Sequence, residues 1–305
     1  KDTMSAFAEG SEEEEEYEEI SAEEKLRIAT HFLLSAPAGE IQELLEDVRK
    51  VIGADVLSDA ALGNVFRTYN LENHTLAEVG DGKFMLVSKH GEVDGTHYVD
   101  TRAGKVYGFN HMTQTWDTSN SSDAPTNDTA EPFRAAVQAA LDTYMDQQYA
   151  DGSDAKSAAA VYATADDTLV CCLAGTATNL RNWWSGGWKG EFTIKLDGTA
   201  SSAQVTGKCE LLIHYFEDGN VQMDTSREFA EDGVGFGDSE ELGTAVVGMV
   251  KKWESGLQAG LETMYSSMSD QTFKDMRRIL PVTYTKFDWS GQQQKQASGA
   301  GSGTL

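Results

Sequence analysis

The sequence has no apolar run of about 18 residues, the length that a helix needs to cross a membrane. It also lacks a basic N-terminal region leading into an apolar segment, which is the pattern of a secretory signal. We therefore predict no membrane span and no secretory signal. We expect a soluble protein that is located in the cytoplasm.

Cysteine is scarce, because Cys171, Cys172 and Cys209 are the only three and none of them forms a CxxC pair. An odd number of cysteines without disulfide spacing suits a reducing compartment. The six histidines form no HExxH motif and no Cys/His pair at zinc spacing. We therefore predict thiols packed as small core side chains, no metal site and no cofactor.

Positive charge is also in short supply, since 24 Lys and Arg residues stand against 50 Asp and Glu residues, for a net charge of −26. Nucleic acids and anionic membranes are bound through basic patches, so neither is an expected partner. The 305 residues, 40% of them hydrophobic and 9% aromatic, have a globular composition with room for one large domain or two ordinary ones.

Local signals divide the chain into eight segments. Ser21 and Glu24 form a capping box that begins the first of three amphipathic helices, which are separated at Pro37 and Gly53. The expected order is an acidic disordered leader (1–20), a three-helix stalk (21–70), a module of short strands (71–116), a flexible polar linker (117–130), a helix with the central antiparallel sheet (131–237), a long helix (238–268), a basic segment (269–289) and a disordered tail (290–305).

Two groups of strands are predicted from turn residues and apolar patterning. The short ones span 83–89, 96–100 and 105–110, and the longer ones span 158–164, 168–174, 190–196, 204–216 and 220–226. The last two are joined as a hairpin by the turn 217–220. Asp238 and Glu241 then begin a helix whose apolar residues recur at steps of three and four, typical of a helix lying across a sheet. The fold class is therefore α+β.

The segment from Met268 to Trp289 is an island of positive charge. Between Asp270 and Lys295 there are five basic and three acidic residues, a local balance of +2. Lys274 and Arg278 stand one helical turn apart, with Arg277 beside them. A solvated basic face explains this pattern as readily as a binding site for an acidic partner, if the residues are considered alone.

No motif predicts catalysis. His214 lies inside a predicted strand and is expected to be a packed or edge side chain, while Gly233, Gly235 and Gly237 lack the lysine and spacing of a phosphate-binding loop. Glu217 and Asp218 are adjacent carboxylates in a solvated turn. The tryptophans at 183, 184 and 188 could stack on a sugar or base, but a tight structural loop against a sheet is favoured. The protein is not expected to be an enzyme.

Several motifs resemble the α subunit of the F-actin capping protein family. The resemblance covers about residues 21–289, although Gly187 and Gly190 replace an expected arginine and serine. The matching segments are 23–29 (EEKLRIA), 36–40 (APAGE), 181–189 (RNWWSGGWK) continuing to Glu191 and Phe192, 213–221 (IHYFEDGNV) and the basic segment 268–289.

This resemblance implies an obligate heterodimer with a capping protein β subunit, in which one antiparallel sheet is shared and each subunit lays a long helix on it. The family caps the barbed ends of actin filaments without catalysis, through C-terminal segments called tentacles. Lys274 and Arg278 fall on actin-contacting positions of the family, and Arg277 and Lys286 are expected to support them. The implied location is the cytoplasm and the cytoskeleton, with cilia as a further candidate.

Two departures keep an alternative open. Tyr284 replaces a third basic residue, and residues 290–305 have no apolar face before Leu305, so a tail helix docking into a groove is not expected. A subunit with weakened tail contacts could instead be built permanently into a larger assembly, such as the actin-related filament of dynactin or a ciliary scaffold. An enzyme or carbohydrate-binding protein based on the tryptophans ranks third.

Overall fold

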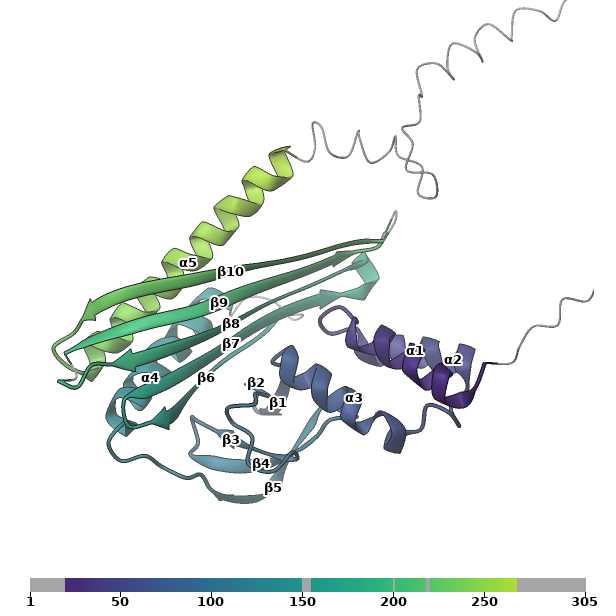
Figure 1. Cartoon of the computed structure of the whole chain (residues 1–305), viewed down its shortest axis with the longest axis horizontal. Helices are drawn as coiled ribbons and strands as arrows, with labels where there is room; N and C mark the ends of the chain where they lie inside the picture. Colours follow the sequence, from purple (N-terminus) through teal and green to yellow (C-terminus); the bar gives the residue numbers. More distant parts are fainter. Residues whose placement is uncertain (1–19, 150–154, 200, 218–219, 268–305) are drawn as a thin grey trace, which may run out of the picture.

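The centre of the protein is a five-stranded antiparallel sheet with the strand order β10-β9-β8-β7-β6 (Figure 1). The computed structural model describes residues 20–149, 155–199, 201–217 and 220–267. Each strand pairs with its neighbour in sequence, so the sheet is a simple meander. The strands are β6 (Ala155–Ala165), β7 (Thr168–Asn179), β8 (Trp184–Leu196), β9 (Ser202–Tyr215) and β10 (Val221–Gly235).

Side chains alternate between the two faces of this sheet, as the pleat requires. In β7, Leu169, Cys171 and Leu173 belong to the core on one face, whereas Val170, Cys172 and Ala174 belong to a second core on the other. The two adjacent cysteines therefore point into different cores. All three cysteines are buried and unbridged, which confirms the prediction of core thiols.

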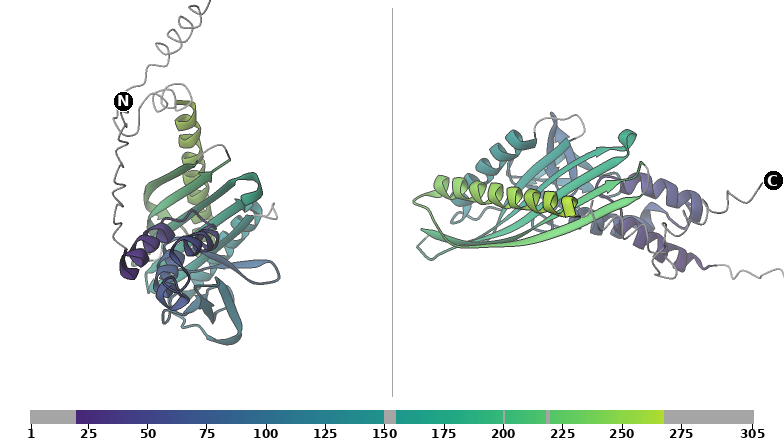
Figure 2. Two further views of the ribbon diagram at one scale, coloured as in Figure 1. Left: turned by 90° about the vertical axis from the view of Figure 1, so that its right-hand side faces the viewer. Right: turned by 90° about the horizontal axis from the view of Figure 1, so that it is seen from above.

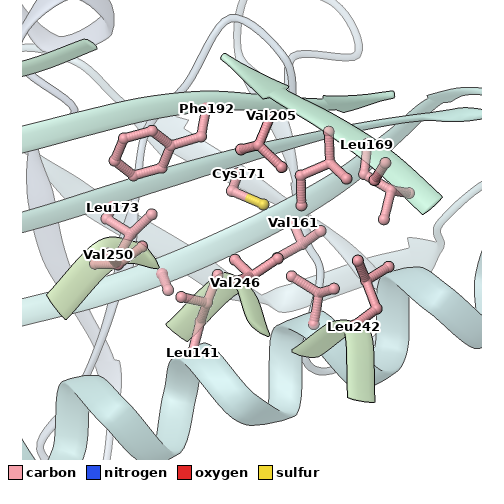
Figure 3. Packing of buried hydrophobic residues seen from close by; sticks show 14 of the residues in the cluster. Leu141, Val161, Leu169, Cys171, Leu173, Phe192, Val205, Leu242, Val246 and Val250 are labelled. Atoms are coloured by element: carbon pink, nitrogen blue, oxygen red, sulfur yellow. The ribbon is translucent and has the colours of Figure 1, made fainter. Parts of the chain in front are cut away.

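Two helices, α4 (Glu131–Tyr149) and α5 (Ser239–Ser267), cover the first face. Figure 3 shows Leu141 of α4 and Val246 of α5 close to Val161 of β6, in the cluster that also contains Phe192 of β8. The start of α5 is capped as predicted, because the Glu241 amide donates to Asp238 Oδ1 at 2.9 Å. Burial of this apolar stripe against the sheet holds the helix in place.

The N-terminal stalk consists of α1 (Ala22–Leu34), α2 (Ile41–Ile52) and α3 (Asp59–Glu72), which pack around a core of their own. Ser21 and Ser58 cap α1 and α3 by accepting backbone N–H groups, as their types favour. Figure 2 shows α1 and α2 extending beyond one end of the sheet. The predicted stalk of three helices is confirmed.

Five short strands link the stalk to α4. β1 (Leu76–Gly80) pairs with β2 (Lys83–Leu86), and β3 (His97–Asp100), β4 (Lys105–Asn110) and β5 (Thr115–Asp123) form a three-stranded sheet. Leu76 and Leu86 pack against the second face of the central sheet, opposite the helices. The central sheet therefore lies between α4 and α5 on one side and the β1–β2 pair on the other.

The prediction of a flexible linker over 117–130 was wrong for its first half. Residues 117–123 continue β5, and Lys105 and Asp123 at its end are joined by an ion pair of 2.6 Å. This strand is almost wholly exposed, so it is held by backbone pairing with β4 rather than by an apolar face, and its Ser/Asn composition hid it. The other segment boundaries remain predictions.

The long strands also exceed their predicted bounds. β8 begins at Trp184, so this tryptophan and Trp188 stand in a strand and not in a tight loop. β10 continues to Gly235, which places Gly233 in a bulged part of the strand with φ of 67°. In the described part of the chain, no helix is both long and apolar enough to cross a membrane. The predicted leader (except Ile20), the basic segment and the tail lie outside the described residues.

Candidate functional site

Strand β10 forms one edge of the central sheet. It is 15 residues long and pairs along nearly its whole length with β9, from Val221 opposite Tyr215 to Gly235 opposite Ser202. Within the described residues no strand pairs with its other side. In an antiparallel ladder, alternate residues direct their N–H and C=O groups away from the partner strand. A long row of backbone groups is therefore offered to another strand.

The side chains of β10 are mostly exposed, and its charged residues are mainly acidic. Asp224, Glu228, Glu231 and Asp232 stand against a single basic residue, Arg227. Lys252 of α5 forms an ion pair of 2.6 Å with Glu231, and this partner lowers the pKa of the carboxyl. The remaining acidic side chains give the edge a negative potential, so a complementary strand should carry basic residues.

Helix α5 lies beside β10 and continues its surface. The ring of Phe229 stacks on Trp253 with centroids 4.9 Å apart, and Trp253 itself is buried. One and two turns later, Leu257 and Leu261 of the same stripe are only partly buried, although Leu257 still packs against the core. The C-terminal part of α5 extends past the sheet (Figure 1). A half-exposed apolar stripe next to an open strand is typical of a surface that a partner completes. We call β10 with residues 253–261 of α5 the edge surface.

The tip of the β9–β10 hairpin is fixed to the stalk by a buried polar group. His214 Nδ1 lies 2.8 Å from Glu40 Oε1, its Nε2 lies 3.2 Å from Asn220 Oδ1, and the Ser185 hydroxyl donates to the same Glu40 oxygen. The His214 ring also stacks on Phe216, with centroids 4.6 Å apart. His214 is therefore a packed side chain, as predicted, and its role is to position the hairpin.

Trp183 and Trp188, which were considered for stacking on a sugar or base, lie in separate environments. Trp188 packs into the core beside Tyr149, with ring centroids 5.6 Å apart, whereas Trp183 is 48% exposed and in the left-handed region at φ 61°. They do not form one stacking platform. Their predicted structural role is supported for Trp188, which closes the core between α4 and the sheet.

The predicted actin-binding residues Lys274, Arg277, Arg278 and Lys286 lie outside the described residues. The structure describes the helix that precedes these residues. This helix, α5, runs along β10 and ends at Ser267. The basic segment therefore follows directly on the edge surface in sequence.

One polar group was not foreseen from the sequence. Ligand atoms of His74, Cys172 and Glu191 come within 4.8 Å of one another at a partly buried place on the second face of the sheet. These residues are widely separated in the sequence, so no spacing motif marks them. Cys172 and Glu191 meet only because β7 and β8 pair in register.

The fold is of the α+β class, with β10 at an open edge of the central sheet in the described part of the chain. The chain belongs to the family described as F-actin capping protein alpha subunit, whose family model matches residues 29–298.

Relatives agree with this membership. The chain is 30% identical over 287 residues to the F-actin-capping protein subunit alpha of Arabidopsis thaliana, covering 90% of this chain and 92% of that protein. It is 29% identical over 272 residues to the subunit alpha of Dictyostelium discoideum, covering 88% and 94%. The structure of a homodimeric actin capping protein alpha subunit from Plasmodium berghei has the same fold, with a TM-score of 0.71, 20% identity, and coverage of 85% and 98%.

Proposed function

We propose that the chain is the α subunit of a heterodimeric capping protein that binds the barbed end of the actin filament and blocks addition and loss of actin subunits. The function requires binding alone, without catalysis or a cofactor. The observation that supports it most strongly is the edge surface, which gives a member of this family an open strand where a second subunit can pair. The proposed location is the cytoplasm and the cytoskeleton.

The charge of β10 supports a different subunit as partner over a second copy. Four acidic residues and one basic residue give the strand a net charge of −3. Pairing two such strands would bring like charges together across the new ladder, which is destabilising. A β subunit with a basic edge would instead complement it, and would cover the exposed backbone of β10 together with Leu257 and Leu261.

Contact with actin is assigned to the basic segment that follows α5. In this proposal Lys274 and Arg278 make the main electrostatic contacts, with Arg277 and Lys286 in support. The rest of the chain carries a large negative charge, so an acidic surface of actin would be attracted only near this segment. The polar tail at 290–305 leaves the apolar part of the contact to the partner subunit.

The polar tail also favours a second candidate function. The same heterodimer could be a fixed component of a larger assembly, such as an actin-related filament of the dynactin type or a ciliary scaffold, in which permanent neighbours replace tail contacts. Isolation of a stoichiometric, salt-resistant complex without actin would support this candidate. A free heterodimer that stops growth at barbed ends would support the first.

The test is co-expression of the full chain with its β subunit, followed by size-exclusion chromatography and seeded actin elongation. A one-to-one complex that stops elongation far below the actin concentration is expected. A chain that does not associate with the β subunit would contradict the heterodimer, and a complex without effect on elongation would contradict barbed-end capping.

A further inference from the structure

A group of metal-binding side chains lies where the end of the stalk meets the central sheet. His74 follows α3, which ends at Glu72, while Cys172 and Glu191 are directly opposite each other on β7 and β8. One ligand atom from each of the three lies within 4.8 Å of the others. The group therefore connects the segment after α3 to β7 and β8, which are themselves paired side by side in the sheet.

One of the three separations is close to that of a tetrahedral site. His74 Nε2 lies 3.8 Å from Glu191 Oε2, and all three ligand atoms lie within 4.8 Å of one another. Zinc bound at about 2.0–2.3 Å by nitrogen, oxygen and sulfur places neighbouring ligand atoms roughly 3.3–3.8 Å apart, so the three atoms would move closer on binding an ion. The other oxygen of Glu191 faces Lys89 Nζ at 3.1 Å and His90 Nε2 at 3.3 Å.

The imidazole of His74 is buried within the group. The residue is 5% exposed, and its Nδ1 has no hydrogen-bond partner among the described residues. A buried imidazole is a usual ligand of zinc.

The Cys172 thiol and the two nearby lysines are compatible with a bound cation. Metal binding would release the proton of Cys172, and the Ser88 hydroxyl, which lies 3.4 Å from the sulfur, could then donate to the thiolate. Lys89 Nζ lies 3.1 Å from Glu191 Oε1, but its side chain is 62% exposed and can turn outward. Lys189 is held by Glu210 at 2.7 Å.

The site can be reached from solvent. An open pocket of about 880 Å³ is lined by His74 and Glu191, together with Lys89, Lys189 and residues of β9 and β10. It provides an entry path and space for a water molecule. A site with three protein ligands and one open position is a common arrangement for zinc.

We propose that His74, Cys172 and Glu191 bind a zinc ion, with water in the fourth position. A set of one imidazole, one thiolate and one carboxylate suits zinc better than magnesium or calcium, which prefer oxygen ligands alone. The ion ties the segment after α3 to β7 and β8, so its effect is to stiffen the junction between the stalk and the sheet.

The experiment uses the full chain, co-expressed with its β subunit, stripped of metal and titrated with Co²⁺ and then with Zn²⁺. The expected result is a thiolate-to-cobalt charge-transfer band with strong d–d bands, both abolished by zinc, and a higher Tm when zinc is present. The substitutions Cys172→Ser and His74→Ala should remove the charge-transfer band and weaken zinc binding by at least about tenfold. Cys171→Ala alters the neighbouring thiol, which lies on the other face of the sheet. It should leave the charge-transfer band and the zinc affinity unchanged.

The cobalt titration of the wild-type complex tests thiolate coordination even if a variant fails to fold. Absence of a thiolate-to-cobalt band in the folded wild-type complex would overturn the proposal. A band that persists in Cys172→Ser, with circular dichroism showing a native fold, would place the metal elsewhere and overturn it as well.

Discussion

His214 Nδ1 lies 2.8 Å from Glu40 Oε1, and this contact joins the β9–β10 hairpin to the start of α2 across 174 positions of sequence. The two side chains are 10% and 12% exposed. The same carboxylate oxygen also accepts from Ser185 in β8. One buried carboxylate therefore fixes the stalk to the end of the sheet where the edge strand begins.

Replacing Glu40 with alanine should destabilise the fold. It leaves two buried polar partners unsatisfied, and such a loss costs about 1–3 kcal/mol in the free energy of unfolding. Urea denaturation of the complex measures it, with Glu46→Ala as the control, because Glu46 is an exposed residue of α2. Equal stability of the two variants would show that the contact does not hold the stalk.

Reversing charge on the edge strand should weaken subunit assembly. Asp224 is exposed on β10, and Asp224→Lys would place a positive charge opposite the proposed basic strand. We expect heterodimer formation to weaken by roughly tenfold, which is about 1.4 kcal/mol. Glu43→Lys, an equal charge change on the exposed face of α2, should have little effect in the same binding titration. If the two variants bind alike, β10 is not the interface.

A half-buried leucine of α5 should matter for assembly more than for the subunit itself. Leu261 is only partly buried and lies outside the main core cluster, and Leu261→Asp would place a charge where the partner is proposed to pack. We expect the variant to remain folded but to elute without the β subunit in size-exclusion chromatography. Thr263→Asp, at an exposed α5 position, is the matched control. Normal heterodimer formation by Leu261→Asp would contradict the proposed edge surface.

A buried carboxyl in α4 should make stability depend on pH. Burial raises the pKa of Asp142 to about 6 from an ordinary value of 3.8. Because the folded state binds this proton more tightly than the unfolded state, the contribution is favourable below pH 3.8 and is lost as the pH rises through about 6.

The substitution Asp142→Asn removes this penalty and keeps an acceptor for Gln138, whose amide now donates to Asp142 Oδ1 at 2.9 Å. A shift of about two pKa units corresponds to roughly 3 kcal/mol, so the substitution should stabilise the protein at pH 7 by up to that amount and flatten the profile in the acid range. Glu46→Gln, at an exposed position of α2, should neither stabilise the protein at pH 7 nor flatten the profile. Parallel stability profiles for wild type and Asp142→Asn would refute the raised pKa.

Actin contact should depend on the basic segment. Reversing the charge of Lys274 and Arg278 together should weaken capping, since each charged contact at a partly exposed site contributes about 1–3 kcal/mol. Growth of pyrene-actin from seeds, followed over a range of complex concentrations, gives the affinity. Unchanged affinity in the double variant would remove these two residues from the contact.

Sequence reasoning succeeded where the signal is local. Ser21, Ser58 and Asp238 cap helices through their own side chains, and the apolar stripe of α5 is a periodic pattern within one element. It failed where pairing is not local. The polar strand β5 is stabilised by the backbone of β4, which its own composition does not reveal.

Contacts between residues far apart in the sequence were likewise not predicted. Glu40 and His214 meet because the stalk folds back onto the sheet, and Cys172 meets Glu191 through strand register. Neither pair has a spacing that could be recognised in advance. The basic residues at 274 and 278 were predicted from charge and resemblance, and they remain a prediction because they lie outside the described residues.

The central claim is that this chain caps actin filaments as one half of a heterodimer. Elongation from preformed seeds, measured with the purified one-to-one complex of the full chain and its β subunit, tests it most directly. We predict that a small fraction of complex relative to actin stops growth at barbed ends and leaves growth at pointed ends unchanged. A folded one-to-one complex that leaves barbed-end growth unchanged would contradict the claim.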